Sequence, residues 1–165
     1  MYDYQHPQKP RIIITRQYKG MKLEQQVVSL ELAQKLNELG VKQESYFFWK
    51  TDEDREMGTS LPYLVAHSSR YMSSKGQVIA SAFTVAELGE LLPDDYFLKD
   101  GSRFKLNSCK MNTGRWRVSY YDGDDLAEEG KTSQVADTEA DARAKMLIYL
   151  LENGLQSLPD IRDSE

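Results

Sequence analysis

The C-terminal segment 138–155 constrains the fold most, because it carries every signal of one complete helix. Thr138 can accept a backbone hydrogen bond as N-cap, and Asp141 places negative charge at the positive end of the helix dipole. Gly154 can adopt the left-handed conformation that ends a helix. One stripe of this helix is apolar and contains Ala140, Ala144, Leu147, Leu150 and Leu151. Such a helix must be covered by another element, and we expect a sheet.

Two further helices are expected upstream. Leucines recur at helical spacing through residues 30–39, directly after Ser29, which can serve as N-cap. Thr84 and Glu87 have the spacing of a capping box, in which the two side chains accept hydrogen bonds from each other's free backbone N–H groups. The helix that they open must end at Pro93, whose ring is incompatible with a helix interior.

The remaining apolar runs predict short strands, over 11–15, 46–49, 61–66, 78–83, 104–110, 115–121 and 132–136. Asn112 to Gly114 is a hairpin turn between the fifth and sixth of these. From residue 84 onward the order is helix, three strands and helix. This order favours an α+β fold, an antiparallel sheet with about three helices packed mainly on one face.

The length of 165 residues suits a single domain. We expect a flexible arm at 1–10, one α+β domain over 11–155 and a flexible tail at 156–165. No apolar run reaches the roughly 18 residues of a membrane span. The single cysteine, Cys109, cannot form an internal disulfide, which fits a soluble protein of the reducing cytoplasm. We expect it to be a buried or partly exposed structural thiol and not a nucleophile.

One hairpin is a basic island in a chain whose formal net charge is −5. The segment 101–121 contains five Lys and Arg residues and no acidic residue. In its strands, basic and apolar side chains alternate, as they would if the cations shared the solvent face. The candidate contacts to a partner or to phosphate are Arg103, Lys105, Arg115, Arg117 and Tyr121. The same alternation is typical of any half-buried strand, so an ordinary wet face is the alternative.

Other clusters of reactive residues indicate no chemistry. His67 precedes two serines, but the second histidine motif that such a phosphoesterase needs is missing, because His6 is followed by Pro7. The acidic loop 122–130 lacks the spacing of a calcium-binding loop, and the pair Asp94–Asp95 is interpreted as solvated surface after a helix end. We therefore expect no catalytic residue, no metal and no cofactor. A non-enzymatic function is favoured, and an enzyme with an unfamiliar site is kept as a third hypothesis.

Three blocks of the sequence belong together: VSLELAQKLNELG (28–40) with QESYFFW (43–49), TVAELGELLP (84–93) and ADTEADARAKMLIYLLENG (136–154). Together they resemble a family of small uncharacterised proteins encoded by bacteriophages and prophages. This resemblance implies a phage protein in the cytoplasm of a host bacterium, and it brings no activity or catalytic residues. The function that we predict is binding of a host or phage protein, with inhibition of host defence as one form of it.

The alternative is binding of a nucleic acid or a phosphate-bearing small molecule through the basic hairpin 101–121. The acidic net charge argues against a general nucleic-acid binder. The helix–strand–strand–strand–helix order is similar to the double-stranded-RNA-binding fold, whose last helix opens with lysines. Here Asp137, Glu139 and Asp141 occupy that place. A homodimer is compatible with the ten tyrosines of the chain, whose amphipathic rings suit interfaces.

Overall fold

The computed structural model describes residues 22–51, 62–67, 76–97, 103–121 and 133–155. The predicted strand at 11–15, both terminal segments, the acidic loop 122–130 and nearly all of the loop 51–60 lie outside these residues. Within them the α+β class is confirmed, with helices and two antiparallel sheets. The expected single sheet is therefore divided in two.

The helices are the 3-10 turn η1 (Leu23–Gln25), α1 (Leu30–Glu38), α2 (Val85–Leu91) and α3 (Glu139–Glu152). One sheet has the order β2-β1-β3 and is built from β1 (Phe47–Thr51), β2 (Tyr63–Ala66) and β3 (Gln77–Ser81). The other has the order β4-β5-β6-β7 and is built from β4 (Asp95–Phe97), β5 (Arg103–Lys110), β6 (Trp116–Tyr121) and β7 (Ser133–Ala136).

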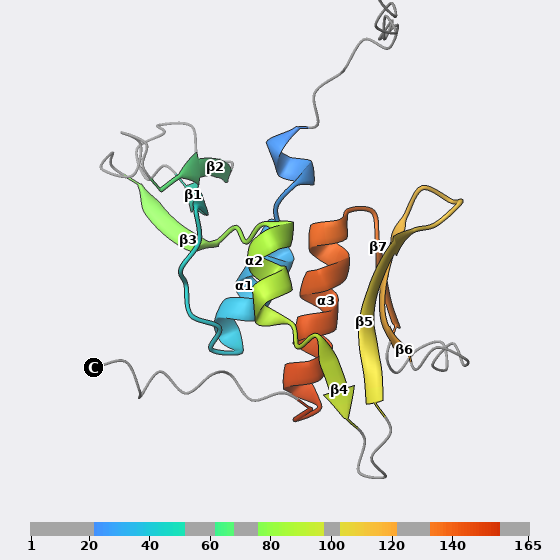
Figure 1. The fold of residues 1–165 in the computed structure, drawn as a ribbon. Helices are drawn as coiled ribbons and strands as arrows, with labels where there is room; N and C mark the ends of the chain where they lie inside the picture. Colours follow the sequence, from blue (N-terminus) through green and yellow to red (C-terminus); the bar gives the residue numbers. More distant parts are fainter. Residues whose placement is uncertain (1–21, 52–61, 68–75, 98–102, 122–132, 156–165) are drawn as a thin grey trace, which may run out of the picture.

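Helix α3 lies at the centre of the molecule. Figure 1 shows it with the sheet β4-β5-β6-β7 on one side and with α1 and α2 on the other. Its buried side chains are therefore more than the predicted stripe: Ala140, Ala142, Ala144, Met146, Leu147, Ile148 and Leu150. Three alanines in the first half of the helix let the neighbouring elements approach closely, because their side chains are small.

The local helix signals operate as the sequence indicates. Thr84 Oγ1 accepts a hydrogen bond from the Glu87 N–H at 3.2 Å, and Glu87 Oε2 accepts one from the Thr84 N–H at 2.6 Å, which completes the capping box. Thr138 Oγ1 accepts from the Asp141 N–H at 3.1 Å. Gly154 has a φ of 63°, the left-handed conformation predicted to end α3.

The expected side-chain cap at Ser29 is wrong. The Ser29 side chain makes no cap hydrogen bond, and its backbone N–H donates to Asp141 Oδ1 at 2.8 Å. Asp141 thus accepts a bond from α1 while its own N–H is capped by Thr138. One carboxylate in the first turn of α3 therefore joins the starts of two helices that are 112 residues apart in sequence.

Strand β4 was not expected, because Asp94–Asp95 reads as a solvated loop after α2. Asp95 instead opens β4 and pairs with Lys105 of β5. The buried Tyr120 anchors this edge, since its hydroxyl donates to the Pro93 carbonyl at 2.6 Å. Burial raises the pKa of Tyr120, with the nearby Asp94 carboxylate adding to the effect. Tyr120 thereby remains neutral and serves as a hydrogen-bond donor.

Candidate functional site

Four of the predicted contact residues, Arg103, Lys105, Arg117 and Tyr121, lie on the side of the four-stranded sheet that faces away from α3, because their strand neighbours pack into the core. The fifth, Arg115, directly precedes β6 and lies beside Arg117 at the hairpin end of this sheet, whose packing against α3 is seen in Figure 1. Cross-strand neighbours on the side facing away from α3 are Lys105 with Tyr121 and Cys109 with Arg117, whereas Leu106 pairs with Tyr120 on the side packed against the helix. Side chains alternate between the two sides of a strand, so the rest of this surface follows from the register. We call it the outer sheet face: Asp95, Phe97, Arg103, Lys105, Asn107, Cys109, Arg117, Ser119, Tyr121, Ser133 and Val135.

The side chains of the outer sheet face differ in solvent exposure more than the alternating sequence indicates. Arg103 and Lys105 are exposed, whereas Arg117 and Tyr121 are half-buried and Ser119 is only 9% exposed. Phe97 at the edge of the sheet is 61% exposed. Aromatic and cationic side chains therefore share this surface, which is the composition typical of protein contact sites.

Cys109 also lies on the outer sheet face, and it is exposed. Of the two forms predicted for this structural thiol, buried or partly exposed, the buried one is therefore wrong. The reason is its register: Cys109 pairs with Arg117, and both side chains point away from α3. Arg117 lies beside Cys109 only because the two residues are paired across the hairpin.

A carboxylate from β4 neutralises part of the predicted basic island. Arg103 Nε donates to Asp95 Oδ1 at 2.8 Å and Arg103 Nη2 donates to Asp95 Oδ2 at 2.5 Å, a two-pronged ion pair. The hydrogen bond from Arg103 lowers the pKa of Asp95, and the charges of Arg103 and Lys105 act in the same direction. Lys105 lies directly opposite Asp95 in the ladder. One carboxylate thus faces two of the predicted cations.

Arg115 has a partner beyond the end of β7. Its Nε lies 3.2 Å from Asp137 Oδ1, and the two side chains are 51% and 90% exposed. An exposed pair of this kind contributes little to stability, about 0–1 kcal/mol. Arg115 is therefore easily exchanged between Asp137 and a group on another molecule.

A hollow of about 550 Å³ lies between α2 and the same sheet, and charged side chains of both signs line it. Its acidic lining comes from the α2–β4 segment, with Glu90, Asp94 and Asp95, and its basic lining from Arg103, Lys105 and Arg143. Arg143 is already held by Glu139, with 2.8 Å between Nη2 and Oε1. Positive charge is therefore matched by nearby negative charge in this region.

His67 lies at the end of β2, beside an aromatic hollow of about 380 Å³ that it lines with Tyr46, Phe48 and Glu87. Its ring centroid is 5.6 Å from that of Phe48, a packing contact. Glu87 Oε1 accepts the Tyr46 N–H at 2.9 Å, and Glu87 Oε2 accepts the Ser45 hydroxyl at 3.1 Å. Both carboxylate oxygens of Glu87 thus connect α2 to the segment before β1. The hollow is therefore lined by a carboxylate with a structural role and by the exposed ring of Tyr46.

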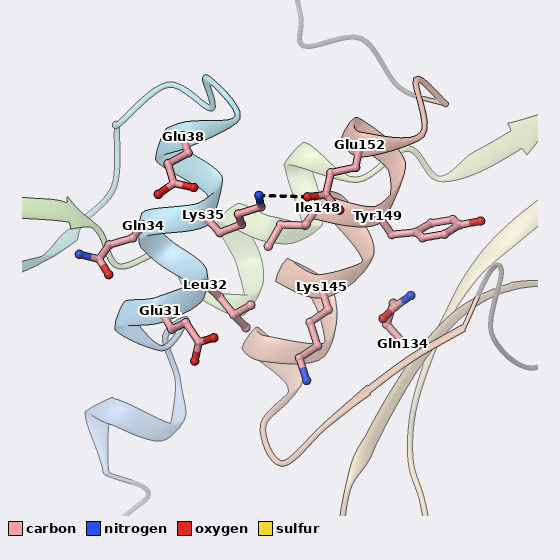
Figure 2. Close-up of a pocket in the computed structure, with 10 residues that line it drawn as sticks. All are labelled: Glu31, Leu32, Gln34, Lys35, Glu38, Gln134, Lys145, Ile148, Tyr149 and Glu152. Carbon is pink, nitrogen blue, oxygen red and sulfur yellow. Dashed lines mark ion pairs between the residues drawn. The ribbon is translucent and has the colours of Figure 1, made fainter.

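A groove that was not predicted lies between α1 and α3, and we call it the α1–α3 groove (Figure 2). It has a volume of about 570 Å³, and its lining residues are Glu31, Leu32, Gln34, Lys35, Glu38, Gln134, Lys145, Ile148, Tyr149 and Glu152. Lys35 Nζ and Glu152 Oε1 meet across it at 3.1 Å. The only sequence signal for this site was the charge at the edges of the two leucine-rich helices, which by itself is typical of any solvated helix.

Among the residues that the structure describes, no group of three or more His, Cys, Asp or Glu side chains could hold a metal ion. No helix in the same part of the chain is long and apolar enough to span a membrane. No family model, no curated protein and no solved structure matches the chain. The phage resemblance therefore stays a prediction.

Proposed function

We propose that the protein is a non-enzymatic phage accessory protein that acts by binding a host or phage protein through its outer sheet face. The observation that carries the proposal is the mixture of groups on this face. Exposed Phe97 and half-buried Tyr121 lie on the same face as Arg103, Lys105 and Arg117. Aromatic side chains and arginines are enriched where proteins contact one another.

The charge arrangement favours a protein partner over a phosphate-bearing one. A phosphate site needs positive charge that is not already neutralised, whereas Asp95 holds Arg103 in a two-pronged ion pair and also lies opposite Lys105. A protein surface carries both signs and can meet such pairs with its own pairs. The phage setting comes from the three resembling sequence blocks, and inhibition of a host defence component is one form that the binding could take.

The test is affinity purification from phage-infected bacteria with three forms of the tagged protein. The first is the wild type, the second is Arg115→Ala/Arg117→Ala, and the third is the control Lys22→Ala/Lys42→Ala. The control removes two exposed cations outside the outer sheet face. Circular dichroism verifies that all three forms are folded. We expect a stoichiometric protein partner with the wild type and the control, and its loss with the second form.

Two outcomes would contradict the proposal. One is a partner that remains bound to Arg115→Ala/Arg117→Ala, and the other is repeated recovery of no partner at all. Retention of the wild type on an oligonucleotide or another anionic matrix, falling steeply with salt and lost in the double variant, would instead support phosphate binding. The two functions are therefore distinguished by what the wild type binds, a stoichiometric protein partner or the anionic matrix.

A further inference from the structure

The α1–α3 groove has an apolar floor between two helices that run side by side in the same direction (Figure 2). Leu32 of α1 and Ile148 of α3 point toward one another along this floor. Leu32 is half-buried and Ile148 is 9% exposed. A third helix laid along two others buries apolar side chains in the seam between them, as in helical bundles.

The lysines of the groove already have partners. Lys35 is paired with Glu152 across the groove at 3.1 Å, and Lys145 Nζ donates to the Val135 carbonyl at 3.3 Å. The carboxylates of Glu31 and Glu38 form no ion pair in the described part of the chain, and both side chains are exposed. The lining therefore has three glutamates against two lysines, a net charge of −1, and the two carboxylates without an ion partner among the described residues both lie on α1.

The two available carboxylates have a defined spacing. Glu31 and Glu38 are seven residues apart, which is roughly 10 Å along a helix and nearly two complete turns. Both lie along the same side of α1, near its two ends (Figure 2). A second helix with basic residues seven positions apart presents two cations at the same spacing, as charged pairs do along the edges of coiled coils.

We infer that the α1–α3 groove binds an amphipathic helix of a partner protein that carries two basic residues seven positions apart. Its apolar stripe covers Leu32 and Ile148, and its two cations meet Glu31 and Glu38. Nucleic acid is disfavoured here, because its phosphates would face these carboxylates. The groove shares no residue with the outer sheet face, so this inference goes beyond the proposed function and can fail separately from it.

The probe is a fluorescein-labelled helical peptide of about 18 residues, long enough to hold a helix in water. It has a leucine stripe flanked by two lysines seven positions apart, and a matched peptide has glutamates in place of these lysines. Fluorescence anisotropy at low ionic strength measures the binding of each peptide to the wild-type protein. We expect saturable binding of the lysine peptide and at least about tenfold weaker binding of the glutamate peptide.

Charge reversal in the protein completes the test. Glu31→Lys/Glu38→Lys should weaken binding of the lysine peptide about tenfold and strengthen binding of the glutamate peptide. The matched control is Glu24→Lys/Glu90→Lys, which changes the net charge equally at exposed positions outside the groove and should behave as the wild type. All four positions are exposed, so thermal melts should show that both variants remain folded.

Three results would overturn the inference: no saturable binding of the lysine peptide, equal binding of the two peptides, or equal weakening by both protein variants. The last would show that only the net charge matters. The affinity purification with Arg115→Ala/Arg117→Ala tests a different surface, so its outcome does not decide this one.

Discussion

Glu87 connects α2 to the segment that leads into β1, and substitution of this residue tests how much the connection contributes to stability. Its carboxylate accepts three hydrogen bonds, from the Thr84 N–H at 2.6 Å, the Tyr46 N–H at 2.9 Å and the Ser45 hydroxyl at 3.1 Å. The first belongs to the capping box of α2, and the other two hold the segment that leads into β1. Replacing Glu87 with alanine removes all three bonds without removing any large apolar surface.

The magnitude follows from these bonds. Loss of a helix cap typically costs about 1 kcal/mol, and a hydrogen bond to a charged group about 1.5–3 kcal/mol. The bond from Tyr46 is exposed, so its contribution lies at or below the low end of that range. We expect Glu87→Ala to lower the free energy of unfolding by about 2–3 kcal/mol. Glu87→Gln should cost about 1 kcal/mol, because glutamine keeps one acceptor oxygen and can still complete a capping box.

Urea unfolding followed by circular dichroism measures these differences, provided that the slope with denaturant is unchanged. The matched control is Glu90→Ala, the same substitution at an exposed position of the same helix. Because helix propensity changes equally, the difference between the two variants reports the hydrogen bonds of Glu87 together with a smaller helix-dipole contribution of about 0.3–1 kcal/mol. Glu90→Ala should stay within about 0.5 kcal/mol of the wild type. Equal destabilisation by the two alanine variants would refute the joining role of Glu87.

Three further predictions concern the core, the end of α3 and the outer sheet face. Leu147 is 1% exposed, so Leu147→Ala should lower the free energy of unfolding by about 2–5 kcal/mol in urea unfolding; a loss below about 1 kcal/mol would show that this packing is wrong. Gly154 has a φ of 63° and open space around its Cα, so Gly154→Ala should cost about 1 kcal/mol from backbone strain alone, whereas no loss in thermal or urea unfolding would place the residue in another conformation. Arg103 lowers the pKa of Asp95, so the contribution of this pair is present above the ordinary carboxyl pKa and disappears as the pH falls through the lowered one. In an NMR titration Arg103→Ala should raise the pKa of Asp95 toward its ordinary value, and an unchanged pKa would contradict the ion pair.

Much of the local structure was predictable, because its causes lie within a few residues. The capping box of Thr84 and Glu87 and the glycine that ends α3 act over one helical turn, and the structure confirms them. The β5–β6 hairpin follows from its turn and from the period of two along the strands. That same period places Arg103, Lys105, Arg117 and Tyr121 on one side of the sheet.

For the candidate site, the sequence predicted which side chains take part but not which of them are paired with carboxylates. Which cations are neutralised depends on carboxylates from other segments: Asp95 reaches Arg103 only because β4 forms, and Asp137 reaches Arg115 only because β7 pairs with β6. Strand β4 has only three residues and a polar start, so it has no periodic pattern of its own. Its place depends on pairing with β5 and on the hydrogen bond from Tyr120.

The amino-acid sequence by itself determined the positions of the three α-helices, the caps of α2 and α3, the hairpin and the α+β class, since these depend on hydrogen bonds and steric preferences between near neighbours. Only the tertiary structure decided that the strands divide into two sheets, that α3 is covered on opposite sides and that an acidic groove lies between α1 and α3. These features depend on which distant apolar surfaces pack together. Many pairings of a few amphipathic segments satisfy the same local rules, and total burial selects among them.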